Sequence, residues 1–495
     1  MEEQINEQDG MDETKIYVGI LQLNSMTKYG SNKSGVPYYL CKPVKHGDPF
    51  FYVASSKKER KKMYVRVRFQ EKKKDQKLPI GQIVDYLGNV GEETVEYEML
   101  RYLHEVDFPS WKLSTKIEEE EEDGPIHETV FSIDPLGSKD IDDAFSFEET
   151  DTHVMIGVHI ANPSRFFEDP SDWQKILEER ISTVYMPHRR CNMLPTDISE
   201  NYASLIEGKR RHTISVLYQI RKEDHFAEFV IEERWVKNRK NYVYEDVDLM
   251  HLSNQWDSQD IQKMFHFSKL YFENEDMDSH QFVEKWMIEA NHDVATHCIY
   301  NFGEKTILRV CPSIPKSEFD QMDIQLKEYI KRGEMKGAEY QYYDEDTYQG
   351  HGQLGYTEYT HFSSPIRRCI DFYIHLLLRG LDITFDLSKV NGRMKKMKKL
   401  DRDLRRMQFL FQHSKKNHID CYGYVVDLSE TCMRIYIPEY NLEEKVVLKD
   451  RMGYSEVEGR EMDRYDMYEK VRVKLFIFVK EEYFRNKIRI QMTKF

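Results

Sequence analysis

Four carboxylates fall within ten consecutive residues of this chain, and no other segment restricts its fold and chemistry as much. The segment reads Asp134-Pro135-Leu136-Gly137-Ser138-Lys139-Asp140-Ile141-Asp142-Asp143. Four negative charges held this closely repel one another unless a cation lies among them. Hard oxygen ligands without a neighbouring His or Cys favour Mg²⁺ or Mn²⁺ over Zn²⁺. The segment suits a two-metal phosphodiesterase, although on spacing alone an acidic surface loop explains such a run more often.

A second segment combines a predicted helix start with two arginines: Tyr359-Thr360-His361-Phe362-Ser363-Ser364-Pro365-Ile366-Arg367-Arg368. Ser363 or Ser364 is expected to cap a helix, Pro365 suits its first position, and Gly380 is expected to end it. The N-terminus of a helix with Arg367 beside it forms a phosphate site. Taken alone, an ordinary capped helix with an arginine–aspartate pair on the surface is the simpler explanation.

The composition is typical of a soluble globular protein. The 495 residues suffice for two to four domains, and 40% of them are hydrophobic. No apolar run approaches the roughly 20 residues that cross a bilayer, and the first residues lack a secretory pattern. Seven scattered cysteines without a C-x-x-C pair argue for reduced thiols and against structural zinc. We expect a cytoplasmic or nuclear protein that is not secreted and has no membrane partner.

The net charge of −15 argues at first against a nucleic-acid partner, but the charge is unevenly distributed. Basic residues gather in residues 57–77 and 393–406, whereas acidic residues gather in the N-terminal tail and in residues 118–123 and 273–278. RNA affinity depends on local basic patches rather than on the average charge. Residues 57–77 therefore suit an RNA backbone, although a solvated charged loop explains them about as well.

Apolar periodicity predicts two barrels around a mixed middle region. We predict a disordered acidic tail in residues 1–14, an OB-type β-barrel in 15–117 and an acidic linker in 118–125. An α+β domain is predicted in residues 126–412 and a second OB-type barrel of five strands in 413–495. Further predicted elements are strands at 16–20, 63–69 and 153–160, a hairpin of 213–220 with 226–236, and helices at 92–104, 279–302 and 386–411.

Both chemistry-bearing segments resemble motifs of the ribonuclease II (RNB) family. The segment from Ile133 to Ala144 is similar to the family's aspartate signature, and the strand at residues 153–161 is similar to the strand that follows it. Residues 359–368 resemble the family motif Y-T-H-F-T-S-P-I-R-R almost letter for letter. Residues 78–94 look like the second cold-shock domain of the eukaryotic exosome catalytic subunit and its relatives. The resemblance covers about residues 15–495.

This resemblance implies a fold and an activity. The fold is α+β, an RNB catalytic domain flanked by an N-terminal cold-shock barrel of the OB type and a C-terminal OB-type RNA-binding barrel. The activity is processive, hydrolytic 3′-to-5′ degradation of single-stranded RNA to nucleoside 5′-monophosphates by a two-metal mechanism. The cofactor is Mg²⁺, for which Mn²⁺ can substitute. Relatives of this kind act as monomers. The resemblance leaves open whether the chain has partners in an RNA-decay complex.

The resemblance also implies roles for individual residues. Tyr185, followed by Met193-Leu194-Pro195, corresponds to the place where the terminal bases are gripped, and Tyr244 and Glu284 correspond to positions near the sugar, where the 2′-OH distinguishes RNA from DNA. The implied catalytic residues are Asp142 and Arg367. The implied metal ligands are Asp134, Asp140, Asp142 and Asp143. The implied RNA contacts are Tyr185, Tyr244, Glu284, Arg367 and Arg368.

The sequence departs from the family pattern at a few positions, and hypotheses other than the enzyme stay open. Asn162 and Arg165 stand where the family usually has Asp and His, and Cys369 stands where it usually has Tyr. Only one N-terminal barrel fits, so we expect a first cold-shock domain to be missing. The alternative is a catalytically silent RNB homologue that binds RNA as a regulator, and the four retained aspartates favour the enzyme. A scaffold subunit of a decay complex is a third hypothesis.

Overall fold

The computed structural model describes residues 13–72, 76–108, 111, 126, 128–167, 170–312, 319, 322–331, 338–381, 383–429, 432–447, 456–457, 465–479, 481 and 483–494. Nearly all of the predicted tail 1–14 and the whole predicted linker 118–125 lie outside these residues. Two compact units make up the chain. The first comprises Met1–Asp107, Met186–Arg189 and Lys395–Phe495, and the second comprises Phe108–Tyr185 and Arg190–Met394. The predicted division into five segments stays a prediction.

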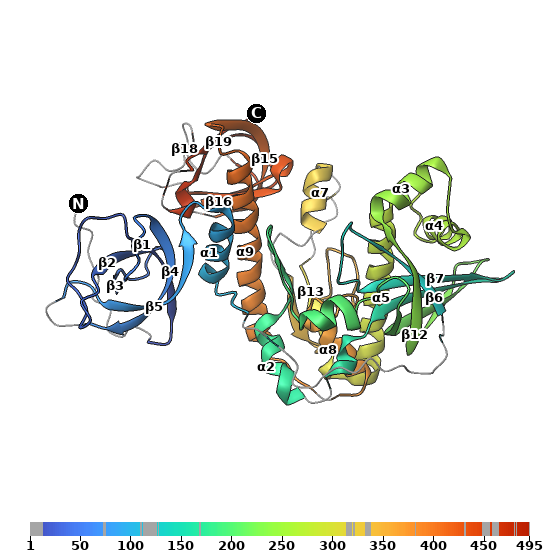
Figure 1. Cartoon of the computed structure of the whole chain (residues 1–495). Coiled ribbons are helices and arrows are strands. Elements are labelled where there is room, and N and C mark those ends of the chain that lie inside the picture. Colours follow the sequence, from blue (N-terminus) through green and yellow to red (C-terminus); the bar gives the residue numbers. More distant parts are fainter. Residues whose placement is uncertain are drawn as a thin grey trace. The chain divides into compact units, whose positions relative to one another are not determined.

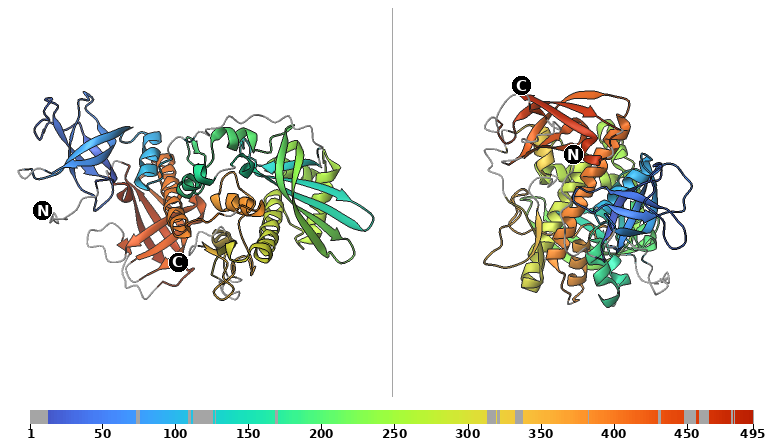
Figure 2. Two further views of the ribbon diagram at one scale, coloured as in Figure 1. Left: turned by 90° about the horizontal axis from the view of Figure 1, so that it is seen from below. Right: turned by 90° about the vertical axis from the view of Figure 1, so that its left-hand side faces the viewer.

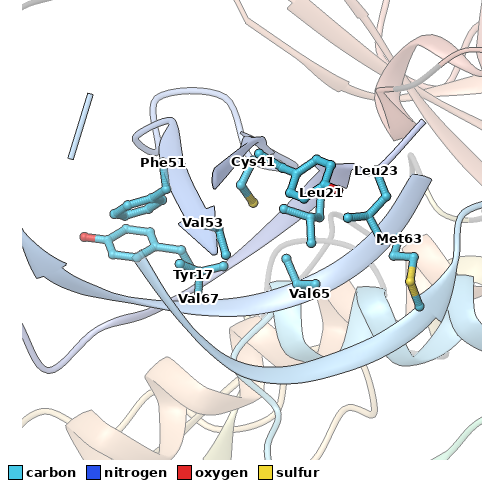
Figure 3. Packing of buried hydrophobic residues seen from close by; sticks show 10 residues of the cluster. Tyr17, Leu21, Leu23, Cys41, Phe51, Val53, Met63, Val65 and Val67 are labelled. Carbon is cyan, nitrogen blue, oxygen red and sulfur yellow. The ribbon is translucent and has the colours of Figure 1, made fainter. Parts of the chain in front are cut away.

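A closed five-stranded barrel opens the first unit. Its strands are β1 (Ile16–Gln22), β2 (Tyr38–Pro43), β3 (Phe51–Ala54), β4 (Lys62–Glu71) and β5 (Ile80–Asn89), in the order β1-β2-β3-β5-β4. Alternating side chains of these strands point inward, so that Tyr17, Phe51 and Val65 meet in one apolar cluster (Figure 3). Helix α1 (Glu93–Leu103) follows the barrel. The predicted N-terminal OB-type barrel is confirmed.

The C-terminal part of the first unit is a six-stranded sheet that follows a long helix, α9 (Leu387–Gln412). Arg406 of α9 forms an ion pair with Glu444 at 2.5 Å and donates to the carbonyl of Phe484 at 2.9 Å, which ties the helix to the sheet. Among the described residues the sheet stays open, as a half-barrel, and includes all five predicted strands. The order is β17-β16-β15-β19-β20-β18, formed by β15 (His418–Leu428), β16 (Cys432–Ile437), β17 (Leu442–Val447), β18 (Glu456–Val457), β19 (Lys470–Ile477) and β20 (Ile488–Lys494).

A second closed barrel forms the core of the second unit. It has the order β11-β12-β6-β7-β8, in which β12 and β6 run parallel and lie side by side (Figures 1 and 2). A polar triad crosses its interior, because fully buried His159 hydrogen-bonds Ser146 and Ser215 at 2.8 Å each. The predicted hairpin of β11 and β12 is confirmed. The strands are β6 (Glu128–Asp134), β7 (Asp143–Glu149), β8 (His153–Ala161), β11 (Arg210–Arg221) and β12 (Ala227–Val243).

Helix α5 (Ser279–Phe302), with the bounds that the sequence predicts, packs against this barrel. A capping box of Asp278 and Gln281 starts the helix, and the ring of Phe282 lies 5.3 Å from that of Phe145 in β7. The other elements of the unit are α2 (Pro170–Arg180), β9 (Val184–Tyr185), β10 (Arg190–Cys191), α3 (Tyr244–Ser253), α4 (Gln259–Tyr271), β13 (Ile307–Val310), α7 (Ile324–Lys331), β14 (Glu339–Tyr342) and α8 (Cys369–Leu378). The predicted α+β fold class, with barrels on both sides of the middle region in sequence, is confirmed.

One predicted helix starts later than expected. Helix α8 begins at Cys369 rather than at Pro365, although Gly380 adopts a left-handed φ of 77° just beyond its end, as predicted. The amide of Ser364 donates to Asp371 at 2.7 Å and the amide of Ile366 donates to Asp142 at 2.9 Å. Because side chains satisfy these amides, residues 363–368 form a turn, and Arg367 lies before the helix rather than on its first turn.

Within the described part of the chain, no helix combines the length and the apolar character that crossing a membrane requires.

Candidate active site

The four aspartates of the acidic segment line one pocket of about 670 Å³ in the second unit. Asp134 ends β6 and Asp143 begins β7, and Asp140 and Asp142 lie in the connecting loop. Between the latter two, Ile141 is buried, and its amide donates to Ser204 Oγ at 2.9 Å. Because Ile141 points into the core, its two acidic neighbours point away from it and into the pocket.

Burial raises the pKa of three of these carboxyl groups. It raises the pKa of Asp142 to about 7 and that of Asp134 to about 6, and the charge of Asp140 adds to both shifts. The pKa of Asp143 lies well above its usual value because the group is buried, and the charges of Asp134 and Asp142 add to the effect. A divalent cation among the carboxylates would relieve both the desolvation and the repulsion.

Two of the aspartates already have cationic partners. Asp142 accepts from Arg367 Nε at 3.0 Å and from the amide of Ile366. Asp140 accepts from the hydroxyl of Tyr185 at 2.8 Å and forms an ion pair with Arg190. In the part of the chain that the structure describes, no three His, Cys, Asp or Glu side chains gather at metal-binding distances. The donor chemistry fits Mg²⁺, which proteins often hold through one or two carboxylates, with water and substrate phosphates completing the shell.

Hydrogen bonds from α5 and α8 hold the second motif in place. Asn291 of α5 accepts from the amides of Phe362 at 2.8 Å and Ser363 at 3.1 Å, and it donates to Tyr359 Oη at 3.1 Å. Arg367 donates to Ser364 Oγ at 2.7 Å as well as to Asp142, and its side chain is still 41% exposed. The arginine is therefore oriented while part of its guanidinium is open to the pocket.

Strands β9 and β10 bring two side chains to Asp140. Tyr185 and Arg190 lie directly opposite each other in this antiparallel pair, and both contact the Asp140 carboxylate. Tyr185 is 52% exposed, and Arg190 also binds Glu200 at 2.6 Å. Sequence reasoning missed Arg190, although its position between Tyr185 and Met193-Leu194-Pro195 is a signal that could have drawn attention to it.

Tyr244 and Glu284 both line the pocket, as the resemblance implies. Tyr244 begins α3, and its ring stacks on His280 of α5 with centroids 3.9 Å apart. Burial, together with the charges of Asp143 and Asp134, raises the pKa of Tyr244. Glu284 lies one turn after His280 on α5 and is exposed. The stacking therefore fixes the tyrosine beside the two aspartates.

The remaining predicted site residue, Arg368, lines the same pocket but is directed toward α8. It pairs with fully buried Asp371 at 2.8 Å. A further arginine that sequence reasoning missed, Arg309 of β13, lines the pocket together with His351 and His361. By contrast, none of the departures at Asn162, Arg165 and Cys369 is among the residues that line the pocket.

The predicted basic segment lies in the other unit, on the N-terminal barrel. Lys57, Lys58 and Arg60 line a pocket of about 470 Å³ with Lys28, whose ammonium lies 3.6 Å from the centre of the Tyr39 ring. Binding of an RNA backbone there stays a prediction.

Comparisons with known proteins agree with this architecture. The RNB domain family model matches residues 126–271 and 258–381, which together exceed half of the chain. The mouse exosome complex exonuclease RRP44 is 24% identical over 81% of this chain and 53% of its own length. The chain spans about half the length of the curated relatives it matches in mouse, nematode and human.

Two solved structures share the fold at low sequence identity. RNase R of Mycoplasma genitalium, solved with ribose-methylated single-stranded RNA, matches with a TM-score of 0.74 and 16% identity over 97% of this chain and 89% of that one. Yeast Ssd1, a pseudonuclease, matches with a TM-score of 0.60 and 15% identity over 88% of this chain and 65% of that one. The fold thus occurs with and without nuclease activity.

Proposed function

Because the chain belongs to the RNB domain family, we propose that it is a hydrolytic 3′-to-5′ exoribonuclease that acts on single-stranded RNA and depends on Mg²⁺, with Mn²⁺ as a substitute. The observation that carries the proposal is the pairing of Asp142 with Arg367 in a pocket that three further aspartates line. Processive release of nucleoside 5′-monophosphates by a monomer is the finer part of the proposal and rests on the resemblance.

In this proposal the aspartates hold cations and Arg367 holds the scissile phosphate. Asp134, Asp140, Asp142 and Asp143 would hold Mg²⁺, which would activate a water molecule and stabilise negative charge on the leaving oxygen. Asp142 has a second task, since its bond to Arg367 Nε fixes the guanidinium. The donors of Arg367 that remain open then bind phosphate oxygens, where negative charge grows in the transition state.

The aromatic and acidic side chains of the pocket position the 3′ end. The half-exposed ring of Tyr185 offers a base a stacking surface, worth about 1–3 kcal/mol. The Tyr244 hydroxyl lacks a hydrogen-bond partner in the described part of the chain, and with Glu284 it offers a donor and an acceptor for a 2′-OH. Arg368, anchored on Asp371, adds positive charge for the strand.

A catalytically silent, RNA-binding homologue is the second candidate function. Asp140 and Asp142 are each neutralised by an arginine, which lowers the negative charge available to a cation. Yeast Ssd1, a pseudonuclease, shares the fold. This candidate predicts RNA binding without cleavage.

Degradation of a 5′-labelled single-stranded RNA in Mg²⁺ distinguishes the two candidates. The wild type is expected to give a ladder or a short limit product, which Asp142→Asn and EDTA abolish. Asp224→Asn, in the exposed turn of the β11–β12 hairpin, is the matched control and is expected to cleave normally. Binding without cleavage by the wild type, also in Mn²⁺, would establish the silent homologue.

A further inference from the structure

One arginine of the pocket is buried without an acidic partner. Of the described residues, three arginines line this pocket, and two of them form ion pairs, Arg367 with Asp142 and Arg368 with Asp371. The third, Arg309, is only 8% exposed, and no acidic side chain in the described ranges lies within ion-pairing distance of it. Among the described residues, the pocket therefore has a cation without an acidic counter-charge.

The contacts of Arg309 orient it without neutralising it. Its position in β13 is directly opposite Tyr340 in β14, and the guanidinium lies 4.6 Å from the centre of the Tyr340 ring. Its amide donates to the carbonyl of Tyr359 at 2.8 Å. The hydrogen bond that its side chain makes goes to the Met394 thioether, a weak acceptor, at 3.6 Å. Most of its five N–H donors thus keep their capacity for a ligand.

The polar neighbours of Arg309 leave its positive charge at this end of the pocket unbalanced. Burial lowers the pKa of His351 to about 4 and that of His361 well below its usual value, and the charge of Arg309 adds to both shifts. Tyr340 Oη lies 2.6 Å from His361 Nδ1, and His351 Nδ1 is buried and has no hydrogen-bond partner among the residues that the structure describes. Near neutral pH these imidazoles are uncharged and add polar atoms without adding charge.

A buried charge is costly unless a partner balances it, so an arginine in this setting indicates an anionic ligand. The planar guanidinium matches the oxygens of a phosphate group, which it can bind through two parallel hydrogen bonds. In the proposed function the scissile phosphate is bound by Arg367, which contacts Asp142 directly.

We propose that Arg309 binds a second phosphate of the RNA strand, distinct from the scissile one. The inference rests on the proposed function for its substrate, single-stranded RNA. Two sources provide the same chemistry: a phosphodiester further along the strand, or a terminal phosphate on a 3′-phosphorylated end. In either case Arg309 binds the strand and fixes its position along the pocket.

Binding measured without cleavage tests this role. The affinity for a fluorescent single-stranded RNA is measured in EDTA at several salt concentrations for the wild type, Arg309→Met, Arg309→Lys and the control Arg221→Met. Arg221 is the exposed last residue of β11, paired with Asp224 of the hairpin turn. Arg309→Met is expected to weaken binding about tenfold or more and to reduce the slope of log K against log salt by about 0.7. Arg309→Lys should restore the slope, and the control should change neither quantity.

Chemically modified RNAs identify the phosphate. A set of RNAs carries one uncharged methylphosphonate linkage each, moved stepwise from the 3′ end, and one further RNA carries a 3′-phosphate. If the source is a phosphodiester, one linkage weakens wild-type binding but leaves Arg309→Met unchanged. If the source is a terminal phosphate, the 3′-phosphate strengthens binding by the wild type alone. Equal responses of the wild type and the variant to every modification would overturn the proposal.

Two controls keep the outcomes separate. Thermal melting shows whether Arg309→Met is folded, and if it is not, Arg309→Gln, which also removes the charge but keeps a polar side chain, replaces it in the comparison. Cleavage is measured separately in Mg²⁺. If the wild type shows an Arg309-dependent phosphate contact but does not cleave RNA, the proposed exoribonuclease activity is overturned and this inference stands. A wild type that cleaves without such a contact overturns this inference alone.

Discussion

Arg367 Nε donates to Asp142 Oδ2 at 3.0 Å, and this contact joins two segments that lie 225 positions apart in the sequence. Asp142 is 3% exposed and Arg367 is partly open to the pocket. The buried partner thus fixes one edge of the guanidinium and leaves other donors for a ligand. The pair connects the acidic segment to the motif that ends in two arginines, and the following prediction depends on it.

Arg367→Lys is expected to lower kcat for RNA cleavage about 100- to 1,000-fold while changing RNA affinity much less. A lysine carries the charge but not the planar set of donors, so it cannot contact Asp142, Ser364 and a phosphate together. Single-turnover cleavage and equilibrium binding measure the two effects. Arg221→Lys is the matched control. If Arg367→Lys lost RNA affinity as strongly as kcat, the assignment of Arg367 to the scissile phosphate would be contradicted.

Two substitutions of Tyr185 separate its ring from its hydroxyl. Tyr185→Ala removes the half-exposed ring and is expected to weaken RNA binding by about 1–3 kcal/mol. Tyr185→Phe removes the 2.8 Å bond to Asp140 but keeps the stacking surface, so its affinity should stay near that of the wild type. Affinity is measured in EDTA. Equal losses for both variants would show that the hydroxyl, and not the ring, carries the contact.

Tyr244→Phe is expected to reduce discrimination against deoxyribose. The variant keeps the stack on His280, with centroids 3.9 Å apart, and loses the hydroxyl that faces the pocket. The test compares kcat/KM for an all-RNA substrate with that for RNAs carrying one 2′-deoxy position near the 3′ end. In the wild type one such position should slow cleavage, and in Tyr244→Phe this difference should shrink. An unchanged ratio would remove Tyr244 from sugar recognition.

Two glycine-to-alanine substitutions test the packing at one position in the barrel of the second unit and one in α9. A Cβ at Gly157 would lie 2.3 Å from both His159 Nε2 and Ser146 Oγ, inside the polar triad, so Gly157→Ala is expected to destabilise by about 1–3 kcal/mol. Gly392 in α9 has nothing within 4 Å of its added Cβ, so Gly392→Ala is expected to stabilise by about 0.5–1 kcal/mol. Melting temperatures that shift in the same direction would contradict this comparison.

The sequence predicts those parts of the fold that local patterns encode. Apolar periodicity predicts both the β11–β12 hairpin and α5, the latter with the observed bounds. The start of α8 could not be predicted in this way. Pro365 is a good first helical residue, but the amide of Ile366 instead bonds Asp142, which is distant in sequence. Tertiary contacts thus outweigh local preference at this position.

The same distinction holds for the candidate site. The four aspartates and Arg367 lie in contiguous motifs, so a sequence pattern suffices to select them. Arg190 and Arg309 stand alone in short strands, and their importance follows only from what the fold brings near them. Arg190 meets Asp140. Arg309 lies over the face of Tyr340 and has no acidic partner among the described residues. Such residues carry no local signal, because burial and partners are properties of the folded chain.

Release of the terminal nucleotide from a 3′-end-labelled single-stranded RNA tests the central claim most directly. With Mg²⁺, the wild type should release the label as a nucleoside 5′-monophosphate from the first time point, while Asp142→Asn and Arg367→Lys bind the same RNA and release it far more slowly. Tight binding by the wild type with no released label in Mg²⁺ or Mn²⁺ would contradict the exoribonuclease and leave an RNA-binding protein with an inactive pocket.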